Sequence, residues 1–203
     1  MTDYFALLEE ARRPWLDTDS LKQKFLARSA EFHPDRVHGA DAATKAAAQQ
    51  DYAELNAAYL CLREPRDRLR HLLELETGHK PGDLHEMPPE LADLFMQIAP
   101  VLRQADGFLA RYTAITSPLL RAQSYGEAQQ FTERLSRLQQ GLREPQEALL
   151  ARLEALGRIW EQQSPAKESK TELLPELESI CRQLGFFSRW HGQLQERLLR
   201  LML

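Results

Sequence analysis

Two apolar stripes with helical spacing, separated by a short polar segment that contains a proline, constrain the fold of this chain most strongly. The first stripe predicts a helix over about residues 18–32, and the second predicts a helix that reaches Leu62. Pro34 lacks an N–H and disfavours the helical conformation at the residue before it, so the first helix should end near Phe32. The two stripes should pack together as an antiparallel helical hairpin with an exposed tip. The stripes consist of Leu21, Phe25, Ser29 and Phe32, and of Ala48, Tyr52, Leu55, Tyr59 and Leu62.

The tripeptide His33-Pro34-Asp35 begins the tip of this predicted hairpin, and Arg36 follows it. Asp35 offers a carboxylate that accepts charge-assisted hydrogen bonds from an arginine of a partner, and Pro34 reduces the conformational freedom of the loop. The alternative is that Pro34 only stops a helix and that Asp35 is a solvated loop residue. The two amphipathic helices that flank the tripeptide favour a binding role.

Basic side chains adjoin the tripeptide on the first predicted helix. Lys24 and Arg28 lie one turn apart on one flank of the helix, and Lys22 lies toward its other side. A basic surface of this kind steers an acidic partner and mainly raises the association rate. The alternative is a solvated helix face without a partner, and the neighbouring tripeptide favours the binding interpretation.

The first third of the chain resembles a J-domain, the module with which co-chaperones stimulate the ATPase of the seventy-kilodalton heat-shock chaperone. The residues that carry the resemblance are Asp3-Tyr4-Phe5 at the start, Glu31-Phe32-His33-Pro34-Asp35-Arg36, and Leu55-Asn56-x-x-Tyr59-x-x-Leu62. The resemblance implies that this region docks on the nucleotide-binding domain of the chaperone and that the chemistry belongs to the chaperone. The implied contacts are His33, Pro34 and Asp35, with Lys22, Lys24, Arg28 and Arg36 as supporting charges.

Composition predicts an all-α protein of two domains. The chain has 203 residues, of which 43% are hydrophobic and 28% are charged, and it contains only nine glycines. A short helix is expected to begin at Pro65 and to end at Gly78. Residues 77–90 contain two glycines and three prolines, so this stretch is interpreted as a linker between a J-domain at 1–76 and a second domain at 91–203.

The second domain is predicted to be an antiparallel three-helix bundle, because three long apolar stripes follow one another with short connections. Ser124-x-x-Glu127 has the pattern of a capping box and predicts the start of the second long helix. Gly141 and Pro145 should bend that helix. The full expectation is a J-domain hairpin with short flanking helices, followed by the bundle.

A J-domain followed at once by a helical bundle, without a glycine-rich segment or zinc-finger cysteines, resembles the HscB-type iron–sulfur assembly co-chaperones. In that family the bundle holds the scaffold protein on which a cluster is built and delivers it to the chaperone. Local similarities are Leu62-Arg63-x-Pro65, Phe95-Met96-Gln97 and Leu184-Gly185-Phe186-Phe187.

The family resemblance implies a client-binding patch at Phe95, Met96 and Phe186. The alternative is that these three residues belong to the bundle core, since apolar residues on helices usually face inward. The family usually follows its Leu-Met pair with glutamates, whereas this chain has Gln97, Ala99 and Pro100. The acidic part of the scaffold contact is therefore absent or displaced.

Several other classes of protein receive no support from the sequence. The formal net charge of −4 does not favour nucleic-acid binding, and no apolar run is long enough for a membrane span, so we expect a cytoplasmic protein without membrane or nucleic-acid partners. Cys61 and Cys181 are far apart and are interpreted as packing residues. The pairs His33 with His38 and His79 with His85 lack a third ligand, so no metal and no cofactor are expected.

Three functions remain in competition. The first is an adaptor that stimulates a chaperone ATPase and presents a scaffold client, and the second is a J-like regulatory or structural protein whose bundle binds a different partner. An enzyme ranks last. The nearest carboxylate pairs are Glu9 with Glu10 and Glu31 with Asp35, which solvation at a helix surface explains. No glycine-rich nucleotide-binding loop is present.

Overall fold

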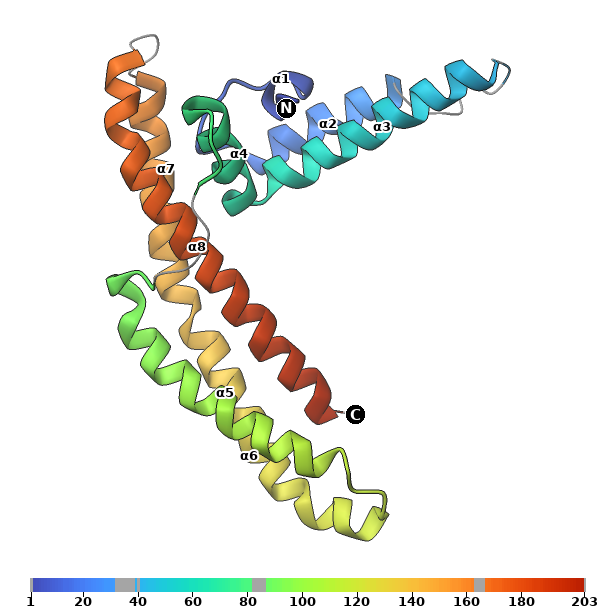
Figure 1. The fold of residues 1–203 in the computed structure, drawn as a ribbon, viewed down its shortest axis with the longest axis vertical. Coiled ribbons are helices and arrows are strands. Elements are labelled where there is room, and N and C mark those ends of the chain that lie inside the picture. Colours follow the sequence, from blue (N-terminus) through green and yellow to red (C-terminus); the bar gives the residue numbers. More distant parts are fainter. Residues whose placement is uncertain (1, 32–38, 40, 82–86, 163–166, 203) are drawn as a thin grey trace. The chain divides into compact units, whose positions relative to one another are not determined.

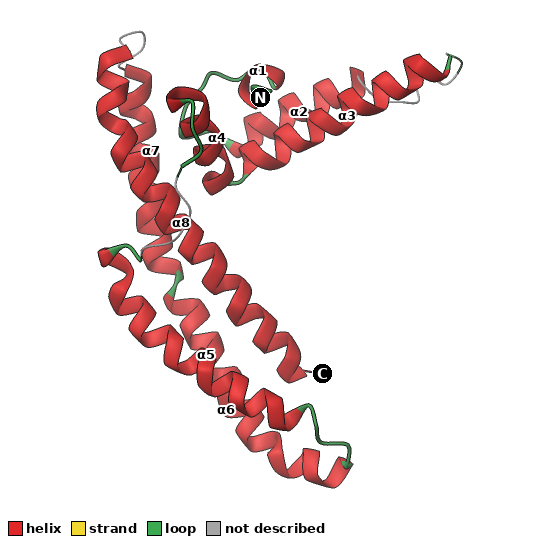
Figure 2. Ribbon diagram, viewed as in Figure 1, coloured by secondary structure: helices red, strands yellow, loops and turns green. Residues whose placement is uncertain are grey.

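The computed structural model describes residues 2–31, 39, 41–81, 87–162 and 167–202. The described residues form helices and no strand, which confirms the all-α class (Figure 2). None of the described helices combines the length and the apolarity that crossing a bilayer requires. The elements are α1 (Tyr4–Leu7), α2 (Thr18–Glu31), α3 (Ala42–Arg63), α4 (Pro65–Thr77), the 3₁₀ turn η2 (Pro89–Leu91), α5 (Ala92–Tyr112), α6 (Pro118–Gly141), α7 (Arg143–Gln162) and α8 (Lys167–Met202).

Contacts divide the chain into two compact units. Unit 1 comprises Met1–Gly82 and Ala151–Cys181, and unit 2 comprises Asp83–Leu150 and Arg182–Leu203. Helices α7 and α8 therefore each contribute residues to both units.

The boundaries predicted from sequence, with a linker at 77–90 and a bundle at 91–203, stay a prediction. The contacts place the change of unit near the same linker, but they group residues 151–181 with the N-terminal segment. Composition identifies a proline- and glycine-rich connection. It carries no information about whether a segment late in the sequence packs on one near the start.

Helices α2 and α3 pack side by side as the predicted hairpin (Figure 1). Leu21 and Leu55 are fully buried between them, and the ring of Phe25 stacks on Tyr59 with centroids 4.2 Å apart. Helix α3 begins at Ala42 because the carboxylate of Asp41 caps it and accepts a hydrogen bond from the backbone N–H of Thr44 at 2.8 Å. The hairpin is therefore confirmed over the described parts of both helices.

Helix α4 has the predicted ends. Pro65 occupies the first turn, where its missing N–H is not needed. Gly78 adopts a left-handed conformation with φ of 79°, and its N–H donates to the carbonyl of Glu74 at 3.0 Å. Leu69 and Leu72 are fully buried, and α4 packs on α3.

Residues of α7 complete the core of unit 1. The indole Nε1 of Trp160 donates to the backbone carbonyl of Arg12 at 2.9 Å, and Arg13 pairs with Glu161 at 2.6 Å. A Cβ atom at Gly157 would lie 2.6 Å from the Cβ of Trp15. This contact requires glycine, and it is one of the contacts that join residues 151–181 to the N-terminal segment.

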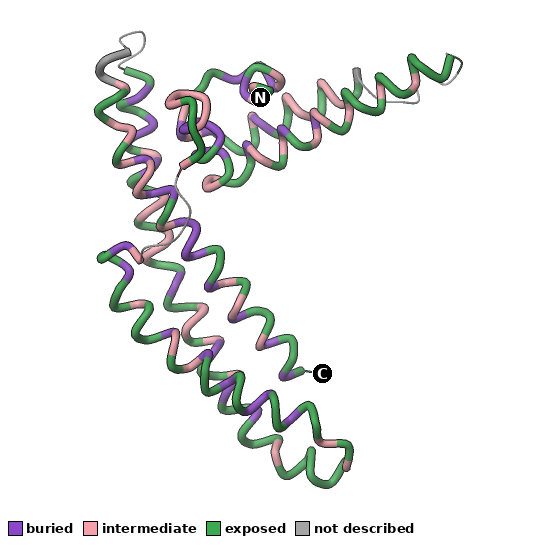
Figure 3. The backbone as a smooth tube through the Cα atoms, viewed as in Figure 1, coloured by how far each residue is buried: buried purple, intermediate pink, exposed green. Residues whose placement is uncertain are grey.

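Unit 2 has its own core, formed by α5, α6 and the last part of α8, in agreement with the predicted bundle. Buried residues recur along each helix at helical spacing, so one face of each helix points into the core (Figure 3). The most buried core members include Ile98, Ala105, Leu109, Leu135, Phe187 and Leu194.

The predicted capping box at Ser124 is wrong. Helix α6 begins at Pro118, with Ser117 at the N-cap position, and the hydroxyl of Ser124 donates to the carbonyl of Leu120 at 3.1 Å inside the helix. Pro118 starts the helix earlier because proline suits the first turn. The sequence predicted one helix that bends at Gly141 and Pro145, whereas the structure ends α6 at Gly141 and begins a separate helix, α7, at Arg143.

Candidate functional site

The segment that joins α2 to α3 carries the predicted tripeptide. His33, Pro34, Asp35 and Arg36 lie outside the described residues. The described neighbours of this segment are the two antiparallel helices of the hairpin, of which α2 carries the three remaining cations predicted to support chaperone binding.

Two of these three cations form ion pairs within the chain. The ammonium of Lys24 lies 2.8 Å from the carboxylate of Glu10 and donates to the backbone carbonyl of Glu9 at 3.0 Å. Arg28 pairs with the carboxylate of Glu9. The prediction that solvation explains Glu9 and Glu10 is wrong for Glu10, which is buried and pairs with Lys24. Glu9 is exposed, as predicted, and it also pairs with Arg28.

The backbone after α1 positions these carboxylates. Glu9 has a φ of 54°, a left-handed conformation that residues with a side chain rarely adopt. The N–H of Glu10 donates to the carbonyl of Phe5 at 2.8 Å, and the buried carboxylate of Glu10 also binds Arg13 at 3.2 Å. The positive charges of Lys24 and Arg28 are therefore partly compensated inside unit 1.

Lys22 provides the outward charge of α2. Its side chain is exposed, and it makes no ion pair with the described residues. Leu26 follows one turn later on the same flank and is 54% exposed. Sequence reasoning did not select Leu26, although its place outside the stripe of Leu21 and Phe25 was the available signal.

A buried histidine fixes α1 on α4. The Nε2 atom of His71 accepts a hydrogen bond from the backbone N–H of Tyr4 at 3.0 Å, and the two rings stack with centroids 4.6 Å apart. Burial lowers the pKa of His71 below its ordinary value, so the ring is neutral at pH 7 and Nε2 is free to accept. Sequence reasoning did not select His71.

Asp3 caps α1 beside this histidine. Its carboxylate accepts hydrogen bonds from the N–H groups of Phe5 and Ala6 and from Arg12. Burial raises the pKa of Asp3, but the hydrogen bonds from Arg12 and from the backbone outweigh burial, so the pKa lies below its ordinary value. The carboxylate is ionised at pH 7 and holds the start of the chain in place.

A buried arginine fixes the corner between α3 and α4. The Nε atom of Arg68 donates to the carbonyl of Pro14 at 2.9 Å, and its Nη1 atom donates to the carbonyl of Leu62 at 2.8 Å. The guanidinium also lies 5.8 Å from the ring centroid of Trp15. Burial lowers the pKa of Arg68 to about 10, so it stays charged at pH 7.

The predicted client patch is divided between the surface and the core of unit 2. Phe95 and Met96 on α5 are 42% and 69% exposed, whereas Phe186 on α8 is only 5% exposed. The ring of Phe186 lies against Trp190, with centroids 5.9 Å apart. The structure therefore places Phe186 in the core and the other two residues at the surface.

A groove between α5 and α8, here called the α5–α8 groove, lies beside Phe95. Phe95 and Trp190 both line it, and its volume is about 280 Å³. Sequence reasoning did not select Trp190. The groove also contains Arg103, and an ion pair of 2.7 Å between Arg197 and Asp106. This surface offers an apolar wall bordered by charges of both signs.

Neither cysteine is in a disulfide. Burial raises the pKa of Cys61 and of Cys181 to about 11, so both thiols are protonated at pH 7. Their sulfur atoms lie 3.5 Å and 3.7 Å from the carbonyl oxygens of Asp67 and Arg66. This arrangement agrees with a packing role. Within the described ranges, no three His, Cys, Asp or Glu side chains converge as a metal site would require.

Comparison with known proteins establishes the fold. No family model matches the sequence. The chain is similar to the crystal structure of the human co-chaperone protein HscB, with a TM-score of 0.61 and 18% identity, over 96% of this chain and 81% of that one. It is also similar to the chaperone HscB from Vibrio cholerae, with a TM-score of 0.61 and 20% identity, over 96% of both chains.

The chain therefore has the fold of the HscB co-chaperones over nearly its whole length. This finding confirms the resemblance that the sequence motifs indicate, at the level of the fold.

Proposed function

We propose that this protein is a J-domain co-chaperone that stimulates the ATPase of a seventy-kilodalton heat-shock chaperone. The observation that carries the proposal is the sequence His33-Pro34-Asp35 in the segment that joins the antiparallel helices α2 and α3. The HscB-like fold supports it. In the proposed docking, Asp35 accepts hydrogen bonds from a cation of the chaperone and Arg36 adds charge to the contact.

The supporting cations are proposed to act unequally. Lys22 reaches a partner directly, because it is exposed and makes no ion pair with the described residues. Lys24 and Arg28 also hold the turn after α1 through Glu9 and Glu10, so part of their role is to position the hairpin. A partner that competes for these two cations has to displace an existing carboxylate.

The substitution Asp35→Asn tests the docking. We expect it to abolish the stimulation of ATP turnover in a steady-state assay with the chaperone, because the neutral amide loses the charge-assisted hydrogen bond. The matched control is Asp51→Asn, the same chemical change at an exposed position of α3. Full stimulation by the Asp35 variant, with an unchanged circular dichroism spectrum, would contradict the proposal.

We further propose that α5 presents a client, with an iron–sulfur cluster scaffold protein as the first candidate. Exposure of Phe95 and Met96 supports this, since large apolar side chains at the surface of a helix form binding hot spots when they are buried by a partner. Phe186 is proposed to act indirectly, by supporting Trp190 at the wall of the α5–α8 groove.

The substitution Met96→Ala tests the client surface. We expect the binding free energy for the client to weaken by about 1–2 kcal/mol, the usual cost of removing an apolar hot-spot side chain. Calorimetry with a purified scaffold protein measures this change. Leu119→Ala on α6 is a matched control, because Leu119 is 69% exposed, as Met96 is. Equal affinities of the two variants would refute the assignment while leaving the chaperone proposal intact.

A J-domain co-chaperone with a different client is the second candidate. The burial of Phe186 and the presence of Gln97, Ala99 and Pro100 in place of glutamates favour it. The test recovers the partners of this protein from the native cell extract. If the recovered proteins include the chaperone but no scaffold protein, this second candidate is favoured.

A further inference from the structure

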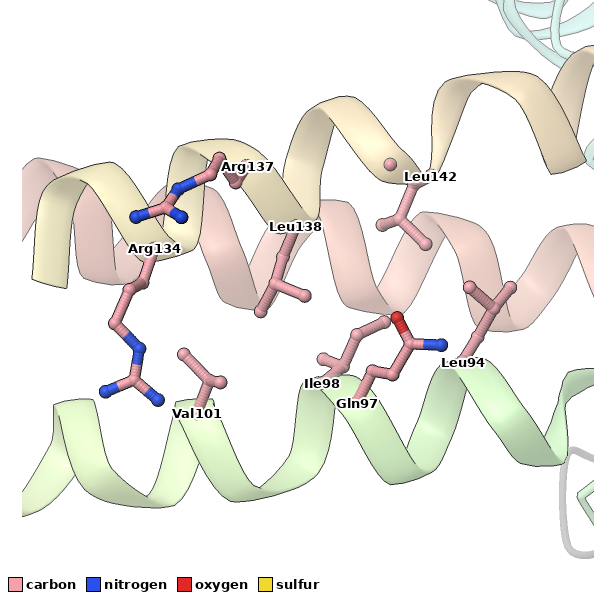
Figure 4. A pocket seen from close by; sticks show the side chains of 9 residues that line it. Leu94, Gln97, Ile98, Val101, Arg134, Arg137, Leu138 and Leu142 are labelled. Carbon is pink, nitrogen blue, oxygen red and sulfur yellow. The ribbon is translucent and has the colours of Figure 1, made fainter.

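A second groove lies on α5, between α5 and α6, and is here called the α5–α6 groove. Its floor is apolar: Leu94, Ile98 and Val101 come from α5, Leu138 comes from α6, and Leu142 directly follows α6 (Figure 4). Ile98 and Leu142 are buried, whereas the other three remain partly accessible. The groove has a volume of about 280 Å³, which is close to the lower end of the range for ligand sites and accommodates apolar side chains rather than a large molecule.

The polar part of the α5–α6 groove has one sign of charge. Arg134 and Arg137 stand on its α6 side, and Gln97 stands between the helices (Figure 4). None of the described residues that line the groove is acidic. The groove therefore carries a local positive charge, although the formal net charge of the chain is −4.

Both arginines are exposed, and neither pairs with a carboxylate among the described residues. The guanidinium of Arg134 lies 5.8 Å from the ring centroid of Phe131, and the Nε atom of Arg137 donates to the backbone carbonyl of Glu133 at 3.4 Å. The side chain of Glu133 instead accepts a weak hydrogen bond from Gln129 at 3.4 Å. The guanidinium groups therefore keep donors for a partner carboxylate.

The α5–α6 groove is separate from the surface proposed to bind the client. Leu94, Ile98 and Val101 recur every four and three residues and share one stripe of α5, whereas Phe95 and Arg103 line the α5–α8 groove on the other flank. Ile98 lies below both grooves. A partner in the α5–α6 groove therefore leaves Phe95 and Met96 accessible.

We propose that the α5–α6 groove binds an acidic amphipathic helical segment of a partner protein. Apolar side chains spaced three and four residues apart fill the floor, and carboxylates on the rim of the segment form bidentate hydrogen bonds with Arg134 and Arg137. Charge complementarity determines the sign of the segment. A membrane surface fits less well, because the apolar residues are recessed between two helices. This inference does not depend on the chaperone or on the scaffold.

The test measures binding of labelled synthetic peptides to the full-length protein by fluorescence anisotropy. The first peptide has about 15 residues, enough to form a helix, with leucines along one face and glutamates beside them. The second has lysines in place of the glutamates, and the third is a scrambled acidic peptide without the apolar stripe. We expect the first peptide to bind at least about tenfold more tightly than the other two, since it alone matches both charge and shape.

Two pairs of substitutions locate the site. Arg134→Glu with Arg137→Glu should weaken the acidic peptide at least about tenfold through like-charge repulsion. Arg182→Glu with Arg200→Glu, which makes the same change of charge at exposed positions of α8, should leave binding unchanged. Arg134→Gln with Arg137→Gln provides a gentler variant if the reversal disturbs the fold, and it should still weaken binding and its dependence on salt.

Four results would overturn the inference. If the scrambled acidic peptide binds as tightly as the first peptide, the binding reflects general electrostatic attraction and not the groove. The same conclusion follows if the α8 control substitutions weaken binding as much as the substitutions at Arg134 and Arg137 do. Binding that disappears with Met96→Ala but survives the two pairs of substitutions at Arg134 and Arg137 would place the peptide on the surface proposed to bind the client. Binding of the protein to anionic lipid vesicles that depends on the two arginines, without peptide binding, would assign the surface to a membrane instead.

Discussion

At the scale of single residues, unit 1 depends on polar groups that are buried and satisfied. His71 accepts from the N–H of Tyr4, and Arg68 donates to two backbone carbonyls. Such groups stabilise a single arrangement of helices, because each alternative packing leaves a buried donor or acceptor without a partner. These two residues hold α1 and the segment before α2 against α4, beside the apolar interface of the hairpin.

His71 should make stability depend on pH. Its pKa is lowered by burial from 6.5 in the unfolded chain, so the unfolded state binds the proton more readily than the folded state does. The stability that neutral His71 contributes is fully present above pH 6.5. It is lost as the pH falls below 6.5 and through the lower pKa that His71 has in the folded state. We expect the free energy of unfolding, measured with urea, to decrease on acidification below pH 6.5.

The substitution His71→Gln isolates this effect. Glutamine keeps an acceptor but does not titrate, so the variant should lose part of the pH dependence. His191 retains its own share, because burial also lowers its pKa. His79→Gln, at an exposed position, should keep the wild-type dependence. An unchanged slope in the His71 variant would show that this histidine does not couple proton binding to folding.

At the scale of elements, a close contact fixes α7 against the connection between α1 and α2. We expect Gly157→Ala to lower the free energy of unfolding by about 1–2 kcal/mol, because overpacking against Trp15 costs more than the gain in helix propensity. Gly107→Ala is the control: nothing lies within 4 Å of its added Cβ. It should raise stability by about 0.5–1 kcal/mol.

Urea unfolding of both variants checks this prediction. If Gly157→Ala is as stable as Gly107→Ala, then α7 accommodates the methyl group by moving, and the contact does not position it.

Patterns local in sequence predicted most of the elements. The hairpin followed from apolar stripes, and the ends of α4 followed from Pro65 and Gly78, because these residues act on their own backbone. The start of α6 was misplaced because Ser124 matched a capping pattern, whereas Ser117 and Pro118 provide the actual start.

The site was predicted less completely, because its missing parts depend on long-range contacts. The ion pairs of Glu9 and Glu10 with α2 require knowledge of the turn after α1, and the burial of Phe186 requires knowledge of which face of α8 meets α5. Arg68 and His71 bind backbone groups, which leave no mark in the sequence.

At the scale of the whole molecule, unit 1 is discontinuous in sequence. A fragment of residues 1–82 lacks the hydrogen bond from Trp160 to Arg12 and the packing of Gly157 on Trp15. We expect amide hydrogen exchange in α4 to be faster in this fragment than in the full chain. The free energy of opening that exchange reports should fall by at least roughly 1 kcal/mol, the contribution of one buried hydrogen bond. Identical protection in the two proteins would show that the N-terminal segment is complete without α7.

The return of residues 151–181 to the first unit also sets an order of events during translation. Small domains usually finish folding soon after they leave the ribosome, beginning with the N-terminal one. Here the nascent hairpin emerges early, but the part of α7 that packs on Trp15 follows only after most of the polypeptide has been synthesised. The first unit therefore reaches its final form almost as late as the second, and ribosome-bound intermediates of this protein should expose that tryptophan.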